Sequence, residues 1–152
     1  QQLHTDRFYR EYRGIAIGTP PAEAGRIDLP IARAEGSPIK RCTESGGAEA
    51  LTEYQVLCRR GELTLLRLTP RTGRTHQLRV HLAAIGCPLL GDWLYGTEDT
   101  ERIGRPALHA ALLRLRHPLT GEVLSLAAAL PADMARFFPD WREAQALFGA
   151  HR

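Results

Sequence analysis

Apolar and polar residues alternate along three early stretches of the chain in the manner of β-strands. Residues 8–18 end in the alternating run GIAI and a glycine, which predicts one strand. Residues 50–60 and 62–70 repeat the alternation on either side of a turn at Arg60 and Gly61. This spacing predicts a β-hairpin.

The apolar period then lengthens from two residues to that of a helix. Leu78, Leu82 and Ile85 fall on one stripe at intervals of four and three. Thr75 can serve the first turn, and Gly86 can end the helix. We therefore expect a helix that begins at Thr75 and stops at Gly86.

The C-terminal third predicts a second hairpin and a last helix. Residues 107–118 and 123–131 are strand-like and are joined by the turn sequence LTGE. Residues 132–149 follow Pro131 with a helical composition, which Pro139 is expected to break or kink. Two hairpins and two helices indicate an α+β domain with a mixed, mostly antiparallel sheet.

A connection of more than 30 residues separates the first strand from the first hairpin. Residues 18–50 are rich in Gly, Pro, Ser and Ala, and only the sequence RIDLPI is expected to be extended. Loops of this length in small domains are often functional.

Composition narrows the class of protein. A chain of 152 residues suits one domain, and it has neither a signal-peptide pattern nor an apolar run of about 18 residues. Cys42, Cys58 and Cys87 are odd in number and have no CxxC spacing. We therefore expect a cytoplasmic protein without a metal site and without a membrane segment.

Positive charge is concentrated in the middle of the chain. The net charge is only +3, but Leu63 to Gly91 contains no Asp or Glu, and Lys40 is the sole lysine among twenty cationic residues. The forked guanidinium group of arginine binds phosphates and stacks on bases. Arginine codons in a GC-rich genome explain the same bias, and both explanations stay open.

Arg79 is expected on the border of the apolar stripe, among small neighbours. A half-buried arginine needs an anionic partner, unless only its stem packs on the core while its head reaches water. Arg71 and Arg74 flank a Thr-Gly pair just before the helix, which resembles a phosphate clamp. His76 and His81 lie about 140° apart on a helix and therefore predict no metal pair.

An acidic residue stands in an aromatic loop that follows the helix. Asp92 lies between Gly91 and Trp93, with Tyr95 close behind. The loop is either a structural turn, which we favour, or a binding loop.

The sequence TGRTHQLRVHLAAIGCPLLGDWLYG resembles the signature of the RluA-type RNA pseudouridine synthases. The likeness continues in order through REYRGIAIG, GRIDLPI, ALTEYQVL and LHAALLRLRHPLTGEVLSLAAALPADM. It implies a catalytic domain with RNA in a central cleft and conversion of a uridine in ribosomal or transfer RNA to pseudouridine. It also implies that neither a cofactor nor a metal is needed.

The resemblance assigns roles to individual residues. Tyr12 in REYRGIAIG matches the tyrosine that stacks on the target base, and Arg79 in QLRVH matches the arginine that pairs with the catalytic aspartate. Arg74 and His76 match the stretch before it and are expected to face RNA or to brace the cleft. Arg71, as part of the clamp outline, is also expected to bind RNA.

The chain departs from the family pattern in one respect. The HRLD motif that carries the catalytic aspartate is absent, and Asp6 stands in the wrong context to replace it. Residues 1–152 therefore resemble the C-terminal portion of the catalytic domain. We expect this portion to be inactive alone, to leave sheet edges uncovered, and either to self-associate or to be only marginally stable. Arg79 should then bind an anion, water or a neighbouring acid.

Two alternatives remain from the sequence. One is a non-catalytic RNA-binding module derived from the same family. The other is a cytosolic enzyme of unrelated fold that acts on a small molecule.

Overall fold

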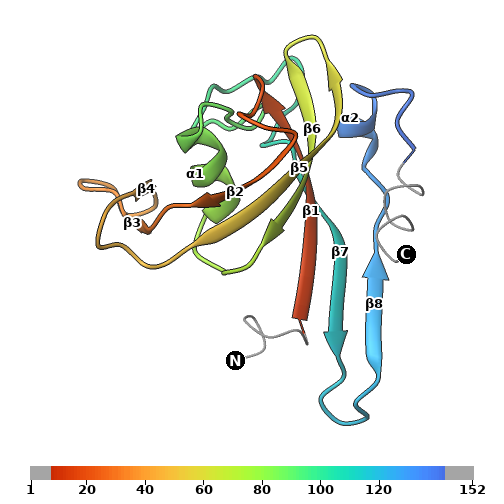
Figure 1. The fold of residues 1–152 in the computed structure, drawn as a ribbon. Coiled ribbons are helices and arrows are strands. Elements are labelled where there is room, and N and C mark those ends of the chain that lie inside the picture. Colours follow the sequence, from red (N-terminus) through yellow and green to blue (C-terminus); the bar gives the residue numbers. More distant parts are fainter. Residues whose placement is uncertain (1–7, 143–152) are drawn as a thin grey trace.

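The computed structural model describes residues 8–142, which form a curved antiparallel sheet and two short helices. The sheet has six strands in the order β2-β5-β6-β1-β7-β8, and a separate pair, β3 and β4, projects to one side (Figure 1). The elements are β1 (Phe8–Ile17), β2 (Ala24–Asp28), β3 (Ile31–Arg33), β4 (Arg41–Thr43), β5 (Leu51–Arg60), β6 (Leu63–Pro70), α1 (Gln77–Ala84), β7 (Leu108–Arg116), β8 (Val123–Ala127) and α2 (Ala132–Ala135). The α+β class and the antiparallel pairing are as predicted.

The strand β1 lies at the centre of the sheet, between β6 and β7. Its two sets of alternating side chains enter different cores. Tyr12 and Ala16 face α1, in a core that includes Leu66, Leu68 and Leu82. The opposite face of the sheet carries a second core, with members Ile15, Leu63, Leu65, Leu90, Ile103, Ala107, Met134 and Phe138.

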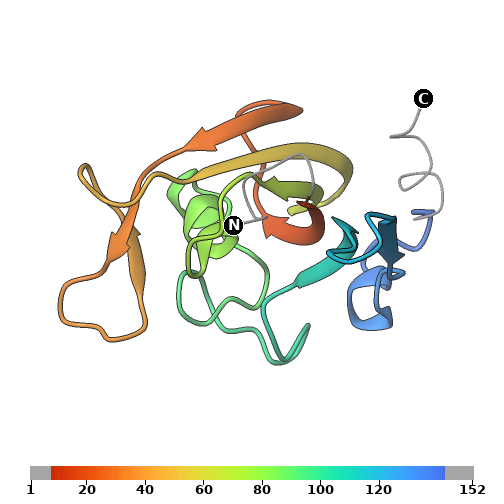
Figure 2. The same ribbon diagram turned by 90° about the horizontal axis from the view of Figure 1, so that it is seen from below.

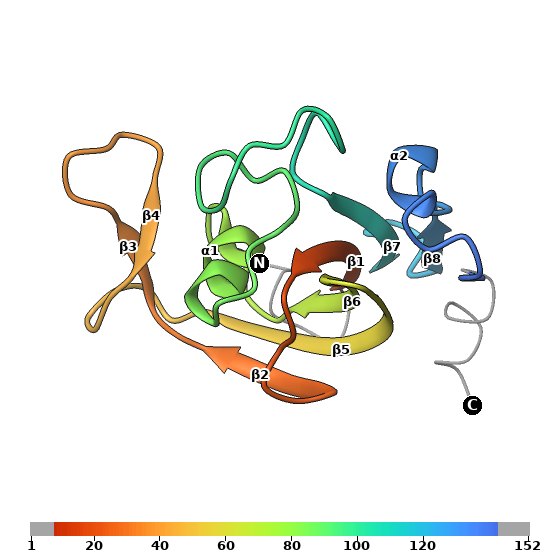
Figure 3. The same ribbon diagram turned by 90° about the horizontal axis from the view of Figure 1, so that it is seen from above.

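The two helices occupy different places around the sheet. Viewed from above and below, α1 lies inside the curve formed by β2, β5, β6 and β1, whereas α2 lies beside β7 and β8 (Figures 2 and 3). None of the helices within residues 8–142 has the length and apolarity to cross a membrane.

The connection predicted as a loop contains three strands. Only the RIDLPI segment was expected to be extended, and it spans the end of β2 and the start of β3. β2 pairs with β5, and β3 pairs with β4. The pattern missed β4 because three residues are too few to show an alternation.

The first helix begins later than predicted. Thr75 lies outside α1, which starts at Gln77 after His76 takes a left-handed conformation with φ +56°. Positive φ is uncommon for a residue with a Cβ, although histidine is among those that adopt it. Gly86, with φ +80°, ends the helix as expected.

The C-terminal helix was predicted too long. α2 covers four residues, Ala132–Ala135, and turns follow it up to Pro139. Proline disfavours helical conformation in the residue before it and offers no N–H, so the helix ends early. The remainder of the predicted helix, residues 143–149, lies outside the described residues, as does Asp6.

The strand β8 forms one edge of the sheet and is exposed along its whole length. Val123 is 57% exposed, Leu124 37% and Leu126 60%. The strand contains no charge and no proline, the devices that usually protect an edge. Among the described residues, the sheet therefore ends in an apolar strand that lacks these devices.

Candidate functional site

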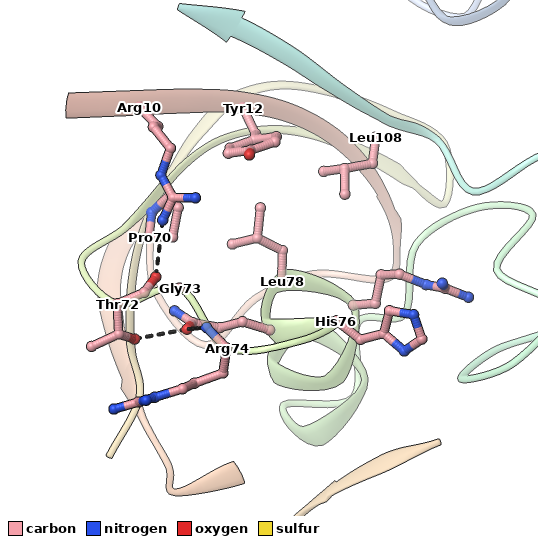
Figure 4. A pocket seen from close by; sticks show the side chains of 11 residues that line it. Arg10, Tyr12, Pro70, Thr72, Gly73, Arg74, His76, Leu78 and Leu108 are labelled. Atoms are coloured by element: carbon pink, nitrogen blue, oxygen red, sulfur yellow. Dashed lines mark hydrogen bonds between the residues drawn. The ribbon is translucent and has the colours of Figure 1, made fainter. Parts of the chain in front are cut away.

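A cavity of about 260 Å³ lies between the middle of β1 and the start of α1 (Figure 4). The loop between β6 and α1 closes one side, and the first residue of β7 closes another. The lining residues are Arg10, Tyr12, Pro70, Thr72, Gly73, Arg74, His76, Gln77, Leu78, Arg79 and Leu108.

The inner surface of the cavity is apolar. The ring of Tyr12 and the side chains of Leu78 and Leu108 point toward one another across it (Figure 4). Leu108 reaches this position because β7 carries one extra residue: Glu11 pairs with Leu112, whereas Tyr12 pairs with Ala110. This bulge changes the face to which the side chains of β7 point.

The rim of the cavity is cationic. Arg10 donates from Nη2 to the carbonyl of Thr72 at 3.1 Å, and Arg74 donates from Nε to the carbonyl of Glu49 at 2.8 Å. His76 and Arg79 complete the rim. None of the described residues that line the cavity is acidic, so the site suits an anionic or electron-rich ligand.

A buried glutamine fixes the loop before α1. Gln77 accepts hydrogen bonds at Oε1 from the Thr72 hydroxyl at 2.7 Å and from the Arg74 N–H at 3.1 Å. Its amide nitrogen donates to the Leu51 carbonyl and to the Thr52 hydroxyl. Gln77 therefore holds the loop, and with it the Arg74 backbone, against β5.

The same network continues to a histidine that is fully buried. His81 Nε2 donates to the Leu29 carbonyl at 2.9 Å, and Nδ1 accepts from the Thr52 hydroxyl at 2.8 Å. Burial lowers the pKa of His81, and the Leu29 carbonyl only partly offsets this effect. The imidazole is therefore neutral in the folded protein.

We expect the stability of the chain to fall between about pH 7.5 and pH 5.5 because of His81. The folded-state pKa is lower than the unfolded value of about 6.5, so the unfolded chain binds the proton first. The free energy of unfolding then decreases by at most about 1.4 kcal/mol per pH unit for this group. Urea unfolding at about pH 7.5 and about pH 5.5 measures this decrease in the free energy of unfolding. In His81→Gln the decrease should be smaller, and an unchanged slope would contradict the assignment.

Arg79 has a carboxylate partner, Asp92. Nε donates to Oδ2 at 3.0 Å and Nη2 donates to Oδ1 at 2.8 Å, which makes a bidentate pair. Oδ1 also accepts the N–H groups of Leu94 and Tyr95, and Asp92 is fully buried. Burial alone would raise the pKa of Asp92, but the bonds from Arg79 and from the Tyr95 and Leu94 N–H groups outweigh it and lower the pKa.

Two aromatic rings flank the guanidinium of Arg79. The distance from its carbon to the ring centre is 5.7 Å for Trp93 and 5.1 Å for Tyr95. The Tyr95 hydroxyl lies 2.7 Å from His76 Nδ1 and accepts the Arg41 N–H at 2.9 Å. Partial burial, and then the charges of Arg79 and Arg41, lower the pKa of His76.

Four of the five predicted site residues meet at the cavity: Tyr12, Arg74, His76 and Arg79. Arg71 does not. It pairs with Glu53 at 3.1 Å, packs against the Tyr9 ring and lines a separate hollow of about 520 Å³.

Sequence reasoning missed several contributors to the site. Arg10, Gln77 and Leu108 line the cavity but carried no recognisable spacing. Asp92 was expected to be either a structural turn or part of a binding loop. It makes the turn, and it is also the neighbouring acid that Arg79 binds.

Potential metal ligands do not gather anywhere in the described part of the chain. Within residues 8–142, no three His, Cys, Asp or Glu side chains lie close enough together to hold an ion.

Comparison with known proteins points to one family. The sequence model of the RNA pseudouridylate synthase family matches residues 1–84. The chain is 41% identical over 136 residues to the uncharacterized RNA pseudouridine synthase YhcT of Bacillus subtilis, a match that covers 88% of this chain and 45% of that protein. It is also 41% identical over 144 residues to the ribosomal large subunit pseudouridine synthase D of Haemophilus ducreyi, covering 86% and 44%. The chain thus spans less than half the length of these relatives.

Solved structures agree with the sequence comparison. The human RNA pseudouridylate synthase domain containing 1 superposes with a TM-score of 0.76 at 28% identity. The superposition covers 95% of this chain and 65% of that one. The alternative of a small-molecule enzyme on an unrelated fold is therefore wrong.

Proposed function

Since the chain belongs to the RNA pseudouridylate synthase family, and to its RluA type, we propose that it is the C-terminal portion of a catalytic domain that converts uridine to pseudouridine in ribosomal or transfer RNA. The single observation that carries this proposal is the cavity, with its apolar floor of Tyr12, Leu78 and Leu108 and its cationic rim. Its volume of about 260 Å³ lies just below the roughly 300–1,000 Å³ of ligand pockets, which suits one flipped base.

The floor and the rim have separate tasks. A uracil that leaves its stack loses roughly a few kcal/mol of stacking and pairing free energy. The Tyr12 ring offers a new stacking partner, and Leu78 and Leu108 exclude water around it. Arg10, Arg74 and His76 lie where they can bind phosphates, which fix the strand without reading its sequence.

The reaction needs a group that the cavity does not hold. The N1–C1′ bond of the nucleotide breaks, the base turns and a C5–C1′ bond forms, while C5 releases a proton and N1 gains one. The resemblance assigns a catalytic aspartate to these steps, and the described cavity lining contains no carboxylate. We therefore propose that the aspartate comes from the part of the longer polypeptide that precedes this chain, and that the chain alone is inactive.

Pseudouridine formation on unmodified cellular RNA tests the proposal. Two proteins are compared: this chain, and a chimera that carries ahead of it the HRLD-containing segment of a full-length relative. We expect activity in the chimera only, and its loss in the chimera with Tyr12→Ala. Activity of the short chain would contradict the missing aspartate.

The alternative function is a non-catalytic RNA-binding module. The observation that favours it is the absence of a carboxylate from the described cavity lining. RNA binding by both proteins without product from either would support this alternative.

A further inference from the structure

Trp93 is the one aromatic side chain among the exposed large apolar residues of the described chain, with 54% of its surface accessible. Tryptophan usually buries most of its area, so an exposed ring leaves an apolar surface in water. The other exposed apolar residues are aliphatic and lie in the β3–β4 loop or the β7–β8 hairpin.

The backbone that carries the ring is anchored on both sides. Asp92, the preceding residue, is fully buried and anchored to Arg79, and its carboxylate also accepts the N–H groups of Leu94 and Tyr95. The backbone on both sides of Trp93 is therefore fixed. The Arg79 guanidinium, 5.7 Å from the ring centre, supports the ring from one side.

Trp93 also continues the rim of the cavity. Arg79 lines the cavity and contacts both Trp93 and Tyr95, and the Tyr95 hydroxyl joins His76 on the rim to the Arg41 N–H on β4. Beyond Arg41 lies another hollow, of about 300 Å³, which Arg33, Arg41 and Arg74 line. Trp93 thus lies against Arg79, and Tyr95 links Arg79 and His76 to Arg41 beside the second hollow.

Proteins that bind single-stranded nucleic acid combine these two features. Cationic side chains follow the backbone, and exposed rings stack on bases whatever their identity. From the exposure, the anchored backbone and the neighbouring arginines, we propose that Trp93 is a stacking platform for an unpaired base of the RNA strand, next to the nucleotide in the cavity. This inference rests on the proposed function and adds a second base-binding position to it.

The fluorescence of Trp93 gives a direct readout. The chain has two tryptophans, Trp93 and Trp141, so Trp141→Phe leaves Trp93 as the sole reporter. We expect an oligouridylate to quench this fluorescence, and an abasic strand of the same length to leave it largely unchanged, because only a base can stack. Equal quenching by both strands would overturn the proposal.

Affinity provides an independent measurement. Trp93→Ala is expected to weaken oligouridylate binding by about 5- to 150-fold in an anisotropy titration, the range found when one stacking residue is removed. Trp93→Phe should weaken oligouridylate binding less than Trp93→Ala does. Leu119→Ala is the matched control, because Leu119 is 90% exposed but lies in the β7–β8 turn, and it should bind as the unaltered chain does.

The outcomes separate the platform from the proposed function. Tight binding by Trp93→Ala, with no quenching in Trp141→Phe, would overturn the platform and leave the RNA function intact. Failure of the unaltered chain to bind RNA would overturn both.

Discussion

Replacing Asp92 with alanine should destabilise the chain by about 3–5 kcal/mol, the cost of removing one partner from a buried ion pair. Arg79 would keep its charge in a position that is only 15% exposed, without the two hydrogen bonds that now satisfy it. The N–H groups of Leu94 and Tyr95 would lose their acceptor as well. Urea unfolding monitored by circular dichroism measures the change.

Two further variants identify the cause. Glu23→Ala removes an acid from an exposed pair with Arg59, and it should have little effect because water screens such pairs. In the double variant Asp92→Ala with Arg79→Met, the unpaired charge is gone, so part of the lost stability should return. A double variant as unstable as Asp92→Ala would show that the lost turn, and not the charge, is responsible.

We expect the chain to self-associate through β8, and the replacement of Leu126 with glutamate to leave it a monomer. Leu124 and Leu126 on β8 pair with Leu115 and Leu113 on β7, so the four side chains share one apolar face. β8 is the last strand in the sheet order. The backbone groups along its outer edge can therefore pair with another strand. We propose a second copy of this chain as the occupant, with its β8 antiparallel to the first. The sequence Val-Leu-Ser-Leu-Ala then places Leu124 opposite Leu126 of the partner.

Sedimentation velocity distinguishes the two states. The unaltered chain is expected to sediment as a dimer or larger species, and Leu126→Glu as a monomer, since a charge on an edge strand prevents pairing. Leu119→Glu is the control: this residue is equally apolar and more exposed, but it lies in the turn between β7 and β8. If the unaltered chain were monomeric, β8 would not be a pairing edge in this protein.

The sequence predicted those elements whose signals are local. The alternation of β1, the turn at Gly61 and the helix stop at Gly86 all depend on neighbouring residues, and each is present. The start of α1 was predicted wrongly because it depends on Gln77, whose side chain bonds to Leu51 and Thr52 on a distant strand. No window of sequence contains both partners.

The site shows the same division. Tyr12, Arg74, His76 and Arg79 were singled out through a motif, but the partner of Arg79 was left open between an anion, water and a neighbouring acid. Thirteen positions separate Arg79 from Asp92, and only the folded loop brings them together. Leu108 reaches the cavity through a bulge in β7, a feature that alternation alone does not reveal.

The central place of β1 has a consequence for the synthesis of the protein on the ribosome. β1 is made before the other described strands, and it pairs with β6, about fifty residues later, and with β7, about one hundred residues later. Pairings so distant in sequence form slowly, because a long loop must close before any contact is gained. Tyr12 therefore leaves the ribosome well before Leu108, and the floor of the cavity can only be completed once most of the chain has been translated.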